Sequence, residues 1–341
     1  MARYKSILYT TEADSLGVIK SLAELQRYEK QINTGAVRES YVSHVHILPP
    51  KAKGERANIE AIKPGVYALV VEFETFEQRE EIELSTGLKL VRQSTDDKRP
   101  FDSIVRANFP ADGIVAALEE RCFPDEAAED QFLEGLNEVE KTSLRRDQDR
   151  ALIIDQHTIL LLLGAWYIRT VGGKLVDKAI AANADAIVHG LGGLRRLAGQ
   201  ALKQWKICAT PSTEPPVLLL RLEVDPILEL VYVGEDTDWT SLGLTEQSLE
   251  PIFQQMEQLK QEQNAVFVQY QFAPSGAWEL NYALTATGDT ISSNEKLAER
   301  DQKFRDYEEK CAAEGRTIGL SGKLAREQVK SIKLKQPENK E

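Results

Sequence analysis

The chain has 341 residues, a length that predicts two or three domains. Its 42% hydrophobic and 28% charged content excludes a wholly disordered, collagen-like or coiled-coil protein. The net charge of −12 argues against a binder of nucleic-acid backbones, because such proteins normally carry a basic domain.

Residues 1–112 predict a mixed α+β domain. Asp14 or Ser15 is placed to cap a helix, because apolar side chains follow it at helical spacing. Strands are predicted at residues 6–10, 40–48, 65–73, 80–84 and 88–91, the last two as a hairpin. The polar residues 54–62 are expected to form a loop.

Residues 113–150 predict an acidic helical connector, with helices at 113–121 and 125–144. Residues 119–140 contain nine acidic side chains and one arginine, a balance of −8. Such a segment suits attraction to a basic region of the same chain or to a charged partner.

Residues 151–206 form a glycine-rich segment that is both apolar and basic. Residues 159–168 carry no charge, and residues 156–206 hold seven Lys or Arg against two Asp, a balance of +5. We interpret the segment as closely packed helices broken at glycine pairs. The alternative is a helix that contacts a membrane or a partner. Its candidate contact residues are Ile159, Leu161, Leu163, Trp166 and Arg169.

Residues 207–290 predict an α+β domain that ends in a β-hairpin. Strands are expected at 217–224 and 227–233, followed by a helix that Ser248 caps. Two alternating segments around Pro274-Ser275-Gly276 then predict antiparallel strands. Pairing Phe272 with Trp278, Tyr270 with Leu280 and Val268 with Tyr282 would place the large apolar side chains on one face.

Residues 291–341 predict a polar helix at 294–313 and a basic tail. The whole chain is therefore expected to be a multidomain α+β protein. Three widely spaced cysteines argue against a disulfide framework, and the first residues lead into no apolar leader, so a cytoplasmic location is expected.

The sequence offers weak signals for chemistry. His44 and His46 form an H-x-H pair that would chelate a metal if both lie on one strand, although the polar side of an edge strand explains them better, because no ligand spacing is distinctive. No intact nucleophile motif or phosphate-binding glycine loop is present. We therefore expect no cofactor.

The C-terminal hairpin carries a resemblance to a known family. A helix, a strand, Pro-Ser-Gly and then residues 276–282 (GAWELNY) resemble the core of the YezG-like bacterial toxin-immunity proteins. The resemblance covers residues 244–307. It implies a small α+β domain that neutralises a toxin by binding it, without catalysis.

These observations favour a non-catalytic bacterial protein of a toxin-immunity or phage-defence system that binds another protein. The expected contact residues are Trp278, Tyr282, Glu235, Asp236 and Asp238. One alternative is an effector whose residues 156–205 enter a bilayer, and a second is a metal-dependent hydrolase. An oligomer is compatible with each, and no nucleic-acid partner is expected.

Overall fold

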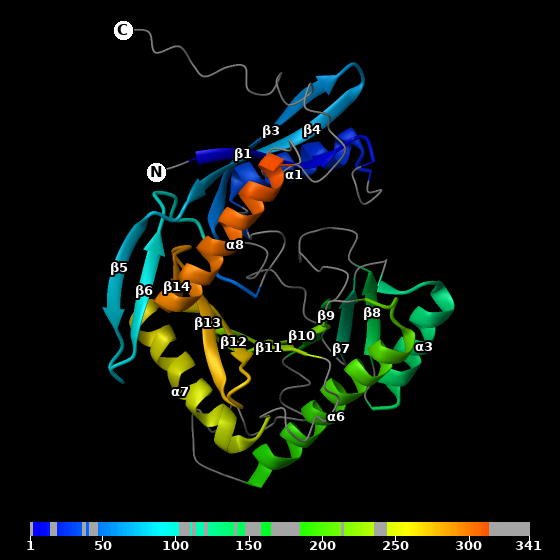
Figure 1. The fold of residues 1–341 in the computed structure, drawn as a ribbon, viewed down its shortest axis with the longest axis vertical. Helices are drawn as coiled ribbons and strands as arrows, with labels where there is room; N and C mark the ends of the chain where they lie inside the picture. Colours follow the sequence, from blue (N-terminus) through cyan, green and yellow to red (C-terminus); the bar gives the residue numbers. More distant parts are fainter. Residues whose placement is uncertain are drawn as a thin grey trace.

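The computed structural model contains two β-sheets and five helices among the residues it describes, which confirms the predicted α+β class. The described residues are 3–13, 19–35, 39–40, 47–101, 110, 114–118, 122–139, 142–146, 158–164, 185–212, 215–234 and 244–313. Figure 1 shows the smaller sheet at one end of the molecule and the larger sheet at the other.

The smaller sheet is antiparallel, with the strand order β1-β4-β3-β2. Its strands are β1 (Arg3–Thr10), β2 (Glu39–Ser40), β3 (Ala52–Lys63) and β4 (Val66–Thr75). Helix α1 (Leu22–Thr34) begins at a capping box formed by Ser21 and Glu24. It buries Leu25, Tyr28 and Ile32 in a core that it shares with the sheet.

The larger sheet has ten strands in the order β5-β6-β14-β13-β12-β11-β10-β9-β7-β8. They are β5 (Gln78–Glu83), β6 (Lys89–Ser94), β7 (Ile114–Leu118), β8 (Thr142–Arg146), β9 (Thr158–Leu163), β10 (Val217–Leu222), β11 (Ile227–Val233), β12 (Ala265–Phe272), β13 (Trp278–Thr285) and β14 (Thr290–Ser292). The pairs β7/β8, β9/β10 and β11/β12 are parallel. The helices that follow the first strand of each pair are α3 (Glu126–Asn137), α6 (Asp185–Cys208) and α7 (Glu246–Gln263).

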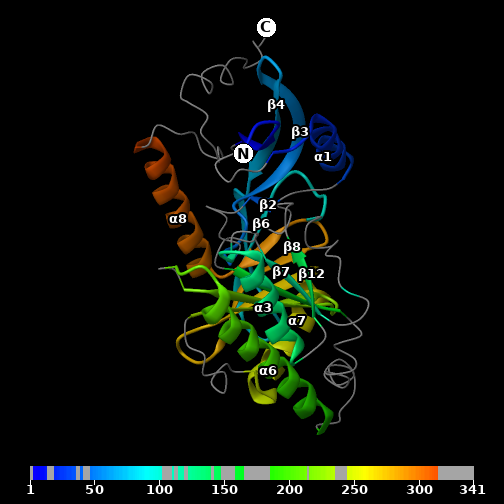
Figure 2. The ribbon, with the colours of Figure 1, turned by 90° about the vertical axis from the view of Figure 1, so that its right-hand side faces the viewer.

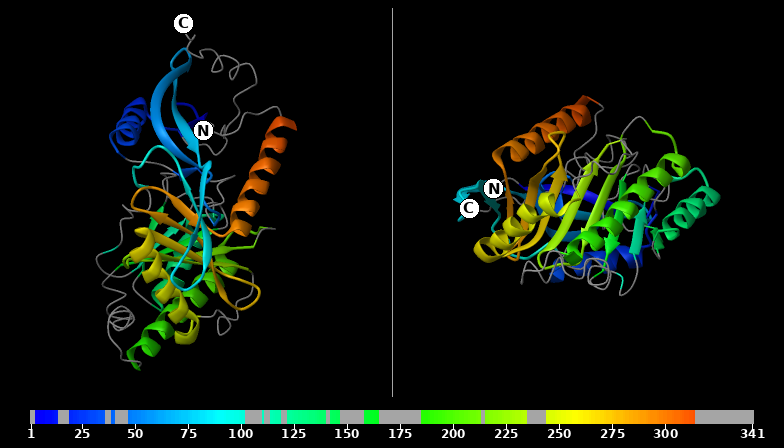
Figure 3. Two further views of the ribbon diagram at one scale, coloured as in Figure 1. Left: turned by 90° about the vertical axis from the view of Figure 1, so that its left-hand side faces the viewer. Right: turned by 90° about the horizontal axis from the view of Figure 1, so that it is seen from below.

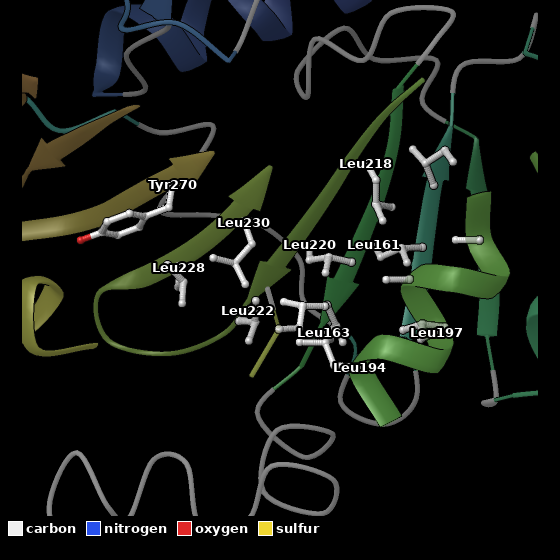
Figure 4. Packing of buried hydrophobic residues seen from close by; sticks show 14 of the residues in the cluster. Leu161, Leu163, Leu194, Leu197, Leu218, Leu220, Leu222, Leu228, Leu230 and Tyr270 are labelled. Carbon is white, nitrogen blue, oxygen red and sulfur yellow. The ribbon is translucent and has the colours of Figure 1, made fainter. Parts of the chain in front are cut away.

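These three helices cover one face of the larger sheet (Figure 1). Alternate leucines of β9, β10 and β11 point toward them and pack with Leu194 and Leu197 of α6, as Figure 4 shows. Burial of each such side chain contributes roughly 1.5–3 kcal/mol. This apolar layer therefore fixes α6 and α7 on the sheet.

Helix α8 (Asn294–Ala313) follows β14 directly. Figures 2 and 3 show α8 and α1 on opposite sides of the smaller sheet. The helix has the position and polar character predicted from the sequence.

Several predicted helices are strands in the structure. Residues 158–163, expected in a helix, form β9, which lies between β10 and β7 and is fully buried. Residues 114–118 form β7 instead of the helix expected at 113–121. Both are short apolar runs buried on two faces, and such runs lack the alternation that marks a half-buried strand.

Three other expectations differ in detail. Residues 54–62, predicted as a loop, belong to β3 and pair with β4. Helix α1 begins after Ser21, while Asp14 and Ser15, the expected caps, lie outside the described residues. Helix α7 is capped by Thr245, whose side chain accepts a hydrogen bond from the Ser248 amide.

The C-terminal hairpin is confirmed, but its predicted register is only partly right. Phe272 pairs with Trp278 and Tyr270 with Leu280, as expected. Asn281 is then an extra residue, so Tyr282 lies opposite Gln269 and not Val268. A bulge of this kind turns the following side chains to the other face. The large apolar side chains therefore divide between two faces.

The larger sheet crosses the predicted domain boundaries. Strands β5 and β6 come from residues 78–94, inside the expected 1–112 domain, yet β6 pairs with β14. The expected segments 113–150, 151–206 and 207–290 all contribute strands to the same sheet.

Candidate interaction surface

Helix α3 carries an acidic stripe on its outer side. It begins at Asp125, whose carboxylate accepts a hydrogen bond from the Ala128 amide at 2.9 Å. Phe132 and Leu136 are buried on its inner side. Asp130 and Glu134, four residues apart and therefore on one side of the helix, are exposed.

Helix α6 carries a basic stripe on its outer side. Its inner side buries Leu197, Ala201 and Trp205. Its exposed side chains include Arg196, Lys203, Lys206 and Ile207. Ile207 is 57% exposed, and Ile19 is the other large hydrophobic side chain that is exposed among the described residues.

The two helices cross closely and run in opposite directions. The ring of Phe132 lies 6.3 Å from that of Trp205, and Gln200 donates a hydrogen bond to the carbonyl of Gly135 at 2.9 Å. A Cβ on Gly135 would lie 2.3 Å from Cδ of Gln204. A Cβ at this position would therefore displace the Gln204 side chain, and the two helices lie side by side (Figure 3, right).

The charges of the two stripes do not neutralise each other. Within the described residues, Asp130 and Glu134 form no ion pair with Arg196, Lys203 or Lys206. We call the exposed side chains of α3 and α6 together the α3–α6 face. A surface of this kind attracts a partner with the reverse arrangement of charges.

The opposite face of the larger sheet holds a buried polar row. It consists of Arg221, Glu229, Gln269, Asn281 and Tyr282, on the adjacent strands β10, β11, β12 and β13. Arg221 donates to Glu229 at 2.6 Å, and Gln269 donates to the second oxygen of Glu229 at 2.7 Å. Asn281 donates to Gln269 at 2.9 Å. Each member is nearly inaccessible to solvent, so the row specifies strand register and does not offer a binding surface.

A second polar cluster joins the smaller sheet to the turn before β14. Lys53 is buried, and its Nζ donates to the carbonyl of Asp97 at 2.5 Å and lies 5.5 Å from the ring of Phe101. Burial lowers the pKa of Lys53 to about 8, although Asp97 and Asp289 oppose this change. A Cβ on Gly288 would collide with the backbone carbonyl oxygen of Arg99 as well as with Nζ, and φ is +70°, so glycine is required there.

An open hollow of about 630 Å³ lies beside this cluster. It is lined by Asn33, Glu55, Arg56, Asp96, Asp97 and Arg99. Arg99 donates to the backbone carbonyls of Ile32 and Glu55 and to the Asp97 carboxylate. Burial raises the pKa of Asp97, but the Arg99 hydrogen bonds outweigh burial and the pKa lies below its ordinary value. The principal charges of the hollow are thus used internally.

Asp301 anchors α8 to the rest of the chain. Its carboxylate accepts from Lys51 at 2.7 Å, from Arg300 at 2.8 Å and from Arg79 at 3.0 Å. Arg300 is 1% exposed and also donates to Gln93 at 2.8 Å. Burial raises the pKa of Asp301, but hydrogen bonds from Lys51 and Arg300 hold it below the ordinary value.

The residues singled out in the sequence do not gather at one place. Trp278 is half-buried beside Phe272, with ring centroids 5.2 Å apart, and Tyr282 is buried in the polar row. The remaining candidates lie outside the described residues; they are Glu235, Asp236, Asp238, Trp166, Arg169, His44 and His46.

The expectation of a lipid-facing or partner-facing helix is wrong for Ile159, Leu161 and Leu163. All three are fully buried in β9, and Leu161 and Leu163 point into the layer of leucines under α6 (Figure 4). Among the described helices, none has both the length and the apolar character needed to cross a bilayer.

Neither metal-ligand clusters among the described residues nor similarity to known proteins gives a further indication of function. Within the described ranges, no three His, Cys, Asp or Glu side chains gather in a way that would hold a metal ion. Comparisons with protein-family models, with curated proteins and with solved structures give no match.

The α3–α6 face was only partly visible in the sequence. The acidic and basic balances of residues 119–140 and 156–206 predicted attraction either within the chain or to a charged partner, and α3 and α6 lie together. The contact itself is apolar and not ionic, through Phe132 and Trp205. Helical spacing would have shown which charged side chains are exposed. Asp130 and Glu134 share the outer side of α3, and Lys203 lies on the outer side of α6, away from the apolar contact.

Proposed function

We propose that this chain is a non-catalytic bacterial protein of a toxin-immunity or phage-defence system that acts by binding another protein through the α3–α6 face. The observation that carries the proposal is the exposure of adjacent acidic and basic stripes whose Asp130, Glu134, Lys203 and Lys206 are without ion pairs among the described residues. Electrostatic complementarity of this type gives specificity and rapid association.

Two further observations support a binding role. The hairpin on which the resemblance to toxin-immunity proteins rests is formed by β12 and β13, and α7 packs against both strands. The strongest polar clusters, at Glu229 and at Asp301, use their charges to hold strands and helices together. The α3–α6 face keeps its charges available to a partner.

The test is capture of the partner from the native host, followed by a protection assay. Immobilised wild-type chain is compared with an Asp130→Lys/Glu134→Lys variant and with a Glu309→Lys control on α8. We expect one protein to be retained by wild type and control and lost by the double variant. Co-expression should then protect cells from that protein only when Asp130 and Glu134 are intact. Retention that ignores the double substitution would refute the proposal.

A further inference from the structure

The α3–α6 face carries both signs of charge at matching positions along two antiparallel helices. Phe132 lies beside Trp205, Gly135 beside Gln204, and Glu138 accepts from Gln200 at 3.2 Å. These contacts set the relative position of the helices. Glu134 is therefore level with Lys203, and Asp130 is level with the turn that contains Lys206.

We infer that two copies of this chain associate face to face, with α3 of each copy lying over α6 of the other. The inference rests on the proposed function, because it uses the same protein-binding face: a second copy occupies that face until the foreign partner displaces it. A two-fold axis that runs in the groove between α3 and α6 produces this arrangement. This axis places α3 of one copy over α6 of the other and leaves every residue at the same level along the helices.

The register then pairs opposite charges throughout. Glu134 of one copy faces Lys203 of the other, and Asp130 faces Lys206, and two-fold symmetry repeats each pair. On α3 the two carboxylates are four residues apart, about 6 Å along the axis, and on α6 the two lysines are three residues apart, about 4.5 Å. The spacings match within the reach of a lysine side chain.

Ile207 adds an apolar contact next to these pairs. Its side chain is 57% exposed in one copy and lies one residue beyond Lys206, so the same arrangement covers it with α3 of the second copy. Removal of this side chain from water favours association at each of the two equivalent positions. The association therefore does not depend on charge alone.

The expected affinity is moderate and depends on salt. Each exposed ion pair contributes little on its own, so the charges mainly set orientation, and we expect dissociation constants of roughly micromolar size. Salt near 1 M reduces the screening length to about 3 Å and should dissociate most of the dimer.

Sedimentation velocity of the full chain tests the inference through charge exchange. An Asp130→Lys/Glu134→Lys variant has two basic helices, and a Lys203→Glu/Lys206→Glu variant has two acidic ones. We expect each variant alone to be monomeric. An equimolar mixture should dimerise again, because every contact between the two variants then joins opposite charges. Circular dichroism confirms that each variant is folded, and Glu309→Lys on α8 is the matched control, which should dimerise like wild type.

The opposite results overturn the inference. A wild-type chain that stays monomeric up to about 100 µM removes the dimer. Dimers that survive both double substitutions, or variants that do not recover on mixing, remove the two-fold arrangement. A monomeric chain that still captures a foreign protein through Asp130 and Glu134 would overturn only this inference. A charge-dependent dimer without any foreign partner would instead overturn the proposed function.

Discussion

Arg221 and Glu229 lie directly opposite each other on β10 and β11 and form an ion pair of 2.6 Å that is almost completely buried. The pair stands at one end of the polar row, and Gln269 holds the second carboxylate oxygen. Arg221 also lies over the ring of Phe267, 5.6 Å from its centroid. Charges in such a position require their partners, because the surrounding medium screens them poorly.

Removal of one member of this pair should strongly destabilise the chain. We expect Arg221→Met to lower the free energy of unfolding by about 3–5 kcal/mol, because Glu229 then stays buried without its counter-charge. The double variant Arg221→Met/Glu229→Gln should recover part of this loss. Urea unfolding of the two variants checks the prediction, and equal losses in both would contradict it.

The stability of the chain should depend on the charge of Lys53. Burial lowers the pKa of Lys53 to about 8 in the folded chain, while the unfolded value is 10.5. Between these two values the unfolded chain binds the additional proton, so stability rises with pH by at most about 3 kcal/mol. Below about pH 8 both states are charged, and the penalty of burying the charge is fully present.

The difference in unfolding free energy between wild type and Lys53→Met isolates this contribution. We expect the wild type to gain on the variant as the pH rises from about 8 to about 10, since methionine does not titrate. Parallel stability curves for the two proteins would show that Lys53 titrates normally. Lys89→Met, at an exposed position on β6, is the control.

The effect of Gly135→Ala on the free energy of unfolding should depend on whether residue 204 is glutamine or alanine. Alanine favours a helix over glycine by about 1 kcal/mol, but its Cβ would collide with the Gln204 side chain. We therefore expect Gly135→Ala to give little or no stabilisation in wild type and about 1 kcal/mol of stabilisation in a Gln204→Ala chain. A double-mutant cycle by urea unfolding measures the coupling, and identical effects in both backgrounds would exclude the close crossing.

Asp301 should hold α8 in place only while it is ionised. Asp301→Asn leaves the buried Arg300 without its carboxylate, so we expect a loss of roughly 2–4 kcal/mol at neutral pH. The lowered pKa means that this stabilisation is present above the ordinary carboxyl pKa and is lost as pH falls through the lowered value. Thermal unfolding should therefore separate the two proteins at pH 7 and not in strong acid.

The matched control for Asp301 is Glu299→Gln, an exposed carboxylate on the same helix. It should leave the midpoint of unfolding nearly unchanged. Amide hydrogen exchange supplies the spatial readout, because only loss of Asp301 should speed exchange in α8. Uniform acceleration across the chain would contradict the local role.

The fold was predictable from sequence where side chains alternate, and not where both strand faces are buried. Strands β12 and β13 have one face under α7 and a clear alternation, so the hairpin was found. Strand β9 is TILLLL with every side chain buried, and an unbroken apolar run fits a buried helix as well as a central strand. Strand β3 is polar and is held along its length by pairing with β4, which local composition does not encode.

The bulge at Asn281 explains why the sequence misplaced Tyr282, one of the expected contact residues. Strict alternation placed Tyr282 with Val268, and a single extra residue moved it into the polar row.

The candidate surface was partly predictable, because charge balance along the chain marked the α3 and α6 segments. Which charges are exposed depends on the crossing at Gly135, and that depends on tertiary packing.

The most direct test of protein binding through the α3–α6 face is photo-crosslinking in the native host from single positions on the chain. A photoreactive residue is placed at Glu134 on α3, at Lys203 on α6, or at Lys303 on α8 as the control. The proposed function predicts adducts to a protein other than this chain from Glu134 and Lys203, and none from Lys303. Adducts from Lys303 alone, or none at either helix of the α3–α6 face, would contradict it.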